Sequence, residues 1–196
     1  MKQRTDEQLL AEYLRGDRQA FTELIGRYQS ELYNYLLKFL SQPALAEDVF
    51  QETFLQVHLS AESFQAERRF RPWLYTIAVN KARDLLRKQK RRQTVQITGQ
   101  GEDESDGQVW DSLLREETTP EDIFDQEQEK VLVRETVDKM PDHLREILIL
   151  AYFQQMPYKE MSDILALPLG TVKSRLHAAV KYFAKLYHEV SAEKTD

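Results

Sequence analysis

Apolar residues at helical spacing are the feature that most constrains the fold of this chain. They recur three or four positions apart in two long stretches, as in Phe21, Leu24 and Tyr28, which places them on one face of a helix. Gly and Pro, which interrupt helices, number only 6 each among 196 residues, and the alternation typical of strands is hard to find. The sequence therefore predicts an all-α protein.

The helical spacing is interrupted over residues 94–126. This stretch contains TGQGEDESDGQ, whose glycines and acidic residues disfavour a packed core. We therefore expect two small helical domains, residues 1–93 and 127–196, joined by a flexible acidic linker. Four apolar residues within the linker leave open that part of it docks on a folded domain: Val109, Trp110, Leu113 and Leu114.

Capping residues indicate where the helices begin and end. The sequence TDEQ from Thr5 to Gln8 fits a capping box, which opens a helix that runs to about Leu14 and ends at Gly16. Asp17 can cap the next helix, which runs to about Leu40. Ser41 and Pro43 together are expected to start a third helix, and a fourth is expected from about Pro72 to Arg92. In the second domain Pro141 is expected to open a helix whose inward residues are Leu144, Ile147, Leu148, Ala151 and Tyr152.

The composition excludes several kinds of protein. The chain has no cysteine, which excludes disulfides and thiolate metal sites, and its 4 histidines show no ligand spacing, so we expect no metal and no cofactor. It has no run of about twenty apolar residues, and the opening MKQRTDEQLL lacks the apolar core of a signal peptide. We expect a soluble cytoplasmic protein with no membrane contact of its own.

The net charge of -6 conceals a strong asymmetry along the chain. Residues 81–92 hold seven Lys or Arg against one Asp, and residues 173–185 hold four basic residues and no acid. Residues 93–129 hold twelve Asp or Glu against one Arg. Local basic blocks, rather than the total, indicate nucleic-acid binding, although a single block is more often a solvated helix face.

The segment LPLGTVKSRLHAAV, residues 167–180, has the pattern of a DNA-reading helix. Pro168 and Gly170 interrupt the chain, and Thr171 is a suitable N-cap. The helix that follows has basic residues on one side and an apolar face made by Val172, Leu176, Ala179 and Phe183. Because a short amphipathic helix, YKEMSDIL, precedes it, the pair predicts a helix-turn-helix. An ordinary helical hairpin is the alternative.

The expected third helix, PALAEDVFQETFLQVHL, carries a patch that a core does not require. Opposite its apolar stripe lie Asp48, Gln51, Glu52 and Leu55. Such a patch can dock a basic partner surface, although a solvated face is the simpler interpretation. An enzyme that used Asp48 and Glu52 as acid and base would need an apolar pocket, and no nucleophile or metal ligand stands near them in the sequence.

The expected fourth helix carries a second such face. Its polar stripe consists of Thr76, Asn80, Arg83 and Arg87, with Trp73 and Asp84 at the edges, and Phe64, Arg68, Arg69, Phe70 and Arg71 come just before it. Aromatic rings beside cations and an Asn can stack on unpaired bases and bind their edges. Phe70 is more simply a core residue, whereas Trp73 suits both roles.

These segments, in this order, resemble the bacterial RNA polymerase sigma factors of the extracytoplasmic-function group. GDRQAFTELIGRY resembles the family's first conserved region, and LAEDVFQETFLQV its polymerase-docking helix. FRPWLYTIAVNKARDLLRK resembles the region that melts and reads the minus-ten element, and YKEMSDILALPLGTVKSRLHAA resembles the minus-thirty-five reader. The resemblance implies a transcription initiation factor, not an enzyme, that gives promoter recognition and strand opening to core RNA polymerase.

The resemblance also implies roles for individual residues. The clamp helices of the polymerase's largest subunit would meet Asp48, Gln51, Glu52 and Leu55, and the polymerase flap region is a second expected contact. Minus-ten promoter DNA would be held by Phe64, Arg68, Arg69, Trp73, Thr76, Asn80, Arg83, Asp84, Arg87 and Lys88, with further phosphate contacts from Lys90, Arg91 and Arg92. Minus-thirty-five DNA would be met by Thr171, Lys173, Ser174, Arg175, His177 and Lys181. An anti-sigma factor is a further expected partner.

Some positions depart from the family's pattern. The family usually has cations where this chain has Ala178 and Val180, so its minus-thirty-five affinity is expected to be lower or differently distributed. Ala166 stands where the family usually has the Gly that precedes the turn. The alternative function is a conventional helix-turn-helix activator or repressor, in which residues 1–93 would sense a signal or dimerise.

Overall fold

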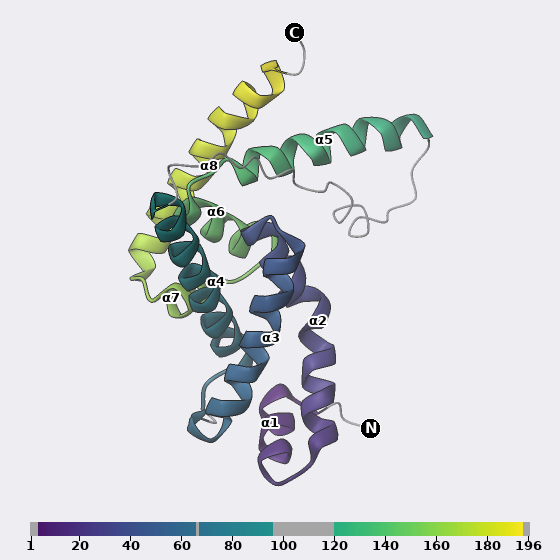
Figure 1. Cartoon of the computed structure of the whole chain (residues 1–196), viewed down its shortest axis with the longest axis vertical. Helices are drawn as coiled ribbons and strands as arrows, with labels where there is room; N and C mark the ends of the chain where they lie inside the picture. Colours follow the sequence, from purple (N-terminus) through teal and green to yellow (C-terminus); the bar gives the residue numbers. More distant parts are fainter. Residues whose placement is uncertain (1–3, 66, 96–119, 194–196) are drawn as a thin grey trace.

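The computed structural model describes residues 4–65, 67–95 and 120–193, and within these ranges the chain is helical, with no strand. The first half contains α1 (Asp6–Leu14), α2 (Arg18–Leu40), α3 (Pro43–Ser60), a short 3₁₀ turn (Ala61–Ser63) and α4 (Phe70–Val95) (Figure 1). The second half contains α5 (Pro120–Asp138), α6 (Asp142–Leu148), the π-helical turn η4 (Ile149–Phe153), α7 (Tyr158–Leu165) and α8 (Leu169–Glu193). The predicted all-α class is confirmed over the described residues.

The helix ends of the first half follow from capping. Thr5 and Gln8 form the expected capping box of α1, and Gly16 adopts a positive φ of 106° after it. The Asp17 carboxylate accepts hydrogen bonds from the first amides of α2. Ser41 was expected to open the third helix, but it ends α2 in the left-handed conformation, and α3 opens at Pro43.

The second half differs from the sequence prediction at three places. Helix α5 begins at Pro120, inside the stretch expected to be linker. Tyr152 was expected to face inward but is 60% exposed, because the wider π-helical turn rotates it away from the core. Thr171 lies inside the first turn of α8, so it is not the N-cap, and Gly170 also lies within that helix. The apolar linker residues 109–114 fall outside the described residues.

The helix-turn-helix is built from α7 and α8. Ala166 ends α7 in the left-handed conformation with φ 53°, the role that Gly usually fills. The hydroxyl of Ser162 donates to the Leu167 carbonyl and fixes the turn. The predicted apolar face is confirmed, because Val172, Leu176 and Ala179 are buried.

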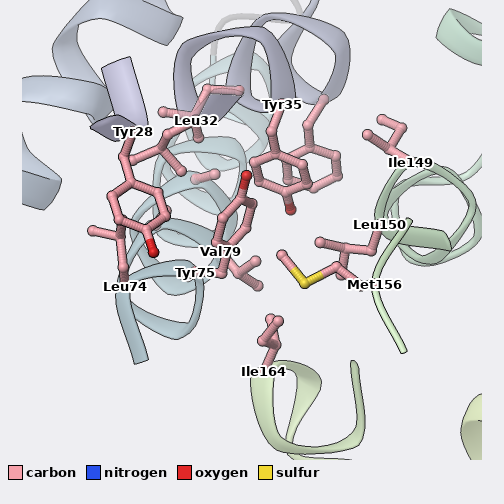
Figure 2. Close-up of a cluster of buried hydrophobic side chains, with 14 of the residues drawn as sticks. Tyr28, Leu32, Tyr35, Leu74, Tyr75, Val79, Ile149, Leu150, Met156 and Ile164 are labelled. Atoms are coloured by element: carbon pink, nitrogen blue, oxygen red, sulfur yellow. The ribbon is translucent and has the colours of Figure 1, made fainter. Parts of the chain in front are cut away.

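The two halves share one hydrophobic core. In the first half, α1 and α3 pack against α2, and α4 packs against α3. The second half places α7 along α4 and η4 against α2. Figure 2 shows one buried cluster to which both halves contribute. The first half supplies Tyr28, Leu32, Tyr35, Leu74, Tyr75 and Val79, and the second supplies Ile149, Leu150, Met156 and Ile164. Side-chain packing therefore holds the second half against the first.

Candidate nucleic-acid and polymerase-binding surfaces

Helix α3 presents its predicted patch to solvent. Asp48, Gln51, Glu52 and Leu55 are all exposed, Leu55 by 57%. Local contacts hold two of them, since Gln51 Nε2 donates to Glu47 Oε1 at 2.7 Å and Glu52 Oε2 lies 3.7 Å from Lys81 Nζ. Two carboxylates beside an exposed Leu can accept a basic partner with an apolar ridge.

The α3 patch continues into a groove of about 530 Å³ between α3 and α4. The α4 wall of this groove consists of Lys81, Asp84, Leu85 and Lys88. Asp84 and Lys88 were expected at minus-ten DNA, whereas Lys81 and Leu85 were not predicted as site residues. Lys81, Asp84, Leu85 and Lys88 are spaced as one face of a helix, so helical periodicity could have indicated Lys81 and Leu85 as part of this wall.

The expected minus-ten residues of α4 divide between two faces of the helix. Asp84 and Arg87 form an ion pair of 2.9 Å at the exposed side, and Asn80 is exposed. Arg83 instead faces the second half of the chain, where its Nη2 lies 2.8 Å from Glu146 Oε2. The Thr76 hydroxyl donates to the Pro72 carbonyl at 2.8 Å, so it is held by its own helix.

The segment before α4 is anchored by aromatic packing. Phe64 lies 4.9 Å from Trp73 between ring centroids, and Phe70 lies 5.7 Å from Trp73. The Phe70 side chain is fully buried, which confirms its interpretation as a core residue, and its amide donates to Glu7 Oε1 at 2.9 Å. Trp73 is partly exposed, so its ring supports the core and still borders the surface.

The basic loop residues Arg68 and Arg69 are exposed at the mouth of a second groove, of about 680 Å³. One wall of the groove comes from the first half, including Trp73 and Thr76, and the other from α7, including Glu160. Arg69 Nη1 lies 2.9 Å from Glu160 Oε1. The predicted minus-ten loop therefore faces a carboxylate of the second half.

The cationic face of α8 is open. Lys173, Ser174, His177 and Lys181 are exposed, and Thr171 and Arg175 are partly exposed. Ala178 and Val180 lie on the same accessible surface, so the missing cations leave part of this face uncharged. The arrangement, an exposed basic face on the second helix of a helix-turn-helix, suits insertion into the major groove.

Sequence reasoning missed the carboxylates of the second half. Glu146 has a side-chain exposure of only 2%, and burial raises its pKa even though Arg83 opposes the shift. Along α6, Glu146 lies opposite the apolar residues Leu144, Ile147 and Leu148, so periodicity alone predicts a solvated position. Its burial comes from contact with α4, which no local pattern signals.

The described residues contain no group of three or more His, Asp or Glu placed to hold a metal ion. Among them, no helix combines the length and the apolarity that a membrane span requires.

Comparison with known proteins assigns each half of the chain to a protein family. The Sigma-70 region 2 family model matches residues 24–92, and the Sigma-70 region 4 model matches residues 130–182. The chain is 33% identical over 182 residues to the ECF RNA polymerase sigma-E factor of Haemophilus influenzae, covering 91% of this chain and 93% of that protein. It is 32% identical over 181 residues to the sigma-E factor of Escherichia coli K12, covering 91% and 92%.

Solved structures show the same fold. One is CnrH in complex with the cytosolic domain of CnrY, with a TM-score of 0.67, 24% identity, and coverage of 94% of this chain and 97% of that chain. Another is the sigma factor RpoE of Bartonella quintana in complex with the anti-sigma factor NepR, with a TM-score of 0.66, 20% identity, and coverage of 85% and 95%. The likeness spans both halves of the chain.

A region 2 fold, a region 4 helix-turn-helix and this order along the chain define a sigma-type promoter-recognition subunit. The chain belongs to the sigma-70 family of RNA polymerase sigma factors, in its extracytoplasmic-function group. It is a transcription initiation factor and not an enzyme.

Proposed function

We propose that this sigma factor works through three surfaces, one for polymerase and two for promoter DNA. The observation that carries the proposal is the exposed patch of α3, where Asp48, Gln51, Glu52 and Leu55 stand together on a family-matched helix. This patch is the docking site for the clamp helices of the polymerase's largest subunit. The flap region of polymerase is a second contact, and the protein acts in the cytoplasm, where polymerase works.

The minus-ten element is bound by α4 and the loop before it. Asn80, Asp84 and the loop cations Arg68 and Arg69 provide hydrogen bonds and charge at the position where an unpaired strand would lie, beside the partly exposed ring of Trp73. Arg87 and Lys88 add phosphate contacts, which are strong and depend on salt. Phe64, Thr76 and Arg83 complete this surface.

The minus-thirty-five element is read by α8. The exposed side chains of Lys173, Ser174 and His177 contact base edges in the major groove, together with Arg175. Thr171 and Lys181 contact phosphates and fix the register of the helix. Ala178 and Val180 carry no charge, so these two positions of α8 provide no ionic contact to phosphates.

An anti-sigma factor is proposed as a further partner. The support is that RpoE of Bartonella quintana, which shares this fold, was solved with the anti-sigma factor NepR. A conventional helix-turn-helix activator is the weaker alternative, because it gives no role to the α3 patch or to the basic aromatic face of α4.

Binding to bacterial core RNA polymerase tests the proposal. The wild-type chain is expected to co-elute with core in gel filtration, and Asp48→Arg/Glu52→Arg is expected to lose co-elution, because reversed charges repel a basic clamp surface. The matched control is Glu62→Arg/Glu189→Arg, which reverses two exposed acids outside the patch and should co-elute like wild type. Co-elution that survives the α3 reversal would contradict the assigned docking site, and no co-elution of wild type would contradict the proposed function.

A further inference from the structure

Ala178 lies on the exposed face of α8 that the proposed function assigns to promoter DNA, yet its side chain has no polar group. The apolar face of the same helix is buried, with Val172 and Ala179 fully enclosed and Leu176 7% exposed. Ala178 itself is exposed, so the hydrophobic core does not account for it. Because its side chain is a single methyl group, it can contribute to DNA binding only through apolar contact.

The position of Ala178 places it among side chains that can reach DNA. At about 100° per residue it lies about 40° around the helix from Ser174 and one turn further along. Arg175 and Lys181, three residues before and after it, are its longer neighbours. Ala178 falls within about the first three turns of α8, which starts at Leu169, and the second helix of a helix-turn-helix contacts bases through its N-terminal part.

The Ser174 hydroxyl defines the kind of base edge beside Ala178. It donates its proton to the Thr171 carbonyl at 3.1 Å, so the remaining lone pairs of Ser174 Oγ act as acceptors on an exposed side chain. In the major groove an acceptor is met by the amino group of adenine or cytosine.

Helix geometry relates this contact to Ala178. Residues four apart on a helix have Cβ atoms about 5–6 Å apart, and successive bases are about 3.4 Å apart along the DNA axis. Ser174 and Ala178 therefore meet the same base pair, or base pairs one or two steps apart.

Thymine is the base that presents an apolar group in the major groove. Guanine, adenine and cytosine offer ring nitrogen, carbonyl or amino groups there, whereas thymine offers its C5-methyl group beside O4. A methyl side chain pressed against a polar edge removes water from a donor or acceptor without replacing the hydrogen bond, which costs free energy. Against the thymine methyl it instead removes apolar surface of both groups from water. Thymine is therefore the base that an alanine at this position favours.

We propose that Ala178 is a specificity-determining residue, which selects thymine in the minus-thirty-five element through contact between its side-chain methyl and the thymine C5-methyl. The inference rests on the proposed function of α8, because it names a base that this helix selects. Ser174 accepts a hydrogen bond from an amino group one or two base steps away at most. The uncharged position at Ala178 is thus a reader of sequence.

Val180 is the matched control for Ala178. It is also apolar and exposed, by 37%, and it lies only two residues away. At about 100° per residue it lies about 200° around the helix from Ala178. When α8 presents Ser174 and Ala178 to the groove, Val180 is on the other side of the helix, outside the proposed contact.

Removing one methyl group from the DNA tests the inference without altering the protein. Polymerase carrying the wild-type chain first selects duplexes from a pool randomised over about ten base pairs, roughly one turn of DNA. In the most enriched duplex each thymine is then replaced in turn by deoxyuridine, which pairs with adenine in the same way but lacks the C5-methyl. Fluorescence anisotropy measures the affinity for each duplex. At one position the replacement should weaken binding about fourfold, the effect of burying one methyl group.

Protein variants assign that effect to Ala178. Ala178→Gly removes the side-chain methyl and Ala178→Ser makes it polar, and each should bind the thymine and deoxyuridine duplexes with equal affinity. Any weakening of the helix by Gly affects both duplexes alike, so it cancels in the comparison. Val180→Ala should keep the fourfold difference. A difference that persists in both Ala178 variants would overturn the inference.

Ser174→Ala checks where the contact lies. It should change the base preference at the methyl-sensitive thymine or within two base steps of it, because Ser174 and Ala178 are neighbours on α8. A change confined to more distant positions would contradict the placement of Ala178.

The inference and the proposed function fail in different ways. If polymerase with the wild-type chain enriches no duplex sequence beyond what core polymerase alone enriches, the proposed reading role of α8 fails, and thymine selection fails with it. If a sequence is enriched but contains no thymine, or tolerates deoxyuridine at every thymine, the reading role stands and only the inference about Ala178 is overturned.

Discussion

The Glu146 carboxylate experiences two opposing effects at the junction of the two halves. Burial raises its pKa, whereas Arg83 and, more weakly, Arg175 favour the charged form, and Asp142 adds a repulsive charge. Because the pKa remains raised, burial outweighs the attraction. The ion pair therefore fixes which residues meet rather than supplying net stability, as is common for buried pairs.

Replacing Glu146 with Gln should change how stability depends on pH. A carboxyl group whose folded pKa is raised adds stability below its unfolded pKa, and that stability is lost as pH rises through the folded pKa. The measurement is the free energy of unfolding in urea between about pH 4 and pH 8. The value for wild type minus the value for Glu146→Gln should decrease as pH rises. Parallel curves for the two proteins would show that Glu146 is not buried against α4 in solution.

At the scale of the elements, the sequence predicted what local chemistry determines. The caps at Thr5 and Asp17 were predicted correctly, because a cap depends only on residues three or four positions away. The start of α8 was predicted wrongly at Thr171, since the left-handed Ala166 completes the turn early and allows the helix to begin at Leu169. Tyr152 was misplaced because a π-helical turn breaks the assumed period.

Helix α8 allows a test that separates positioning from base reading. Lys181→Ala should weaken binding to every duplex about equally, because it removes one phosphate contact. The slope of log binding constant against log salt concentration should become shallower by about 1. Lys173→Ala should instead reduce the preference for a selected duplex over a random one by about 1–3 kcal/mol. Anisotropy titrations of the polymerase-bound chain over a salt series measure both quantities.

The control for these variants is Lys139→Ala. Lys139 is exposed and pairs with Glu193 at the far end of α8, 3.4 Å away, so its loss removes one cation without touching the proposed DNA face. It should bind like wild type. If Lys181→Ala and Lys139→Ala weaken binding equally, only the total charge of the domain matters, and the assigned face of α8 is incorrect.

At the scale of the whole molecule, the sequence predicted two helical halves but not their contact. Periodicity identified most of the residues that face inward within each half, but it made no prediction for Gln154 or Glu146. Their burial requires the second half of the chain to meet α2 and α4, where Glu146 pairs with Arg83 and Gln154 bonds to Tyr75. The acidic stretch that follows α4 separates these residues in the sequence. The exposure of Asp48 on α3 and of Lys173 on α8 could be predicted from helical periodicity. The pairing of Arg83 with Glu146 required the complete fold.

A shared core makes a prediction about unfolding. Because buried residues of both halves form one cluster, the wild-type chain should unfold in a single calorimetric transition whose calorimetric and van't Hoff enthalpies agree. Met156→Lys places a charge in the apolar contact between the halves, where the wild-type side chain is 4% exposed, and should divide the transition in two. Leu59→Lys, at a position 68% exposed, should leave one transition. Two transitions in the wild type would mean that the halves fold independently in solution, which would contradict the shared core.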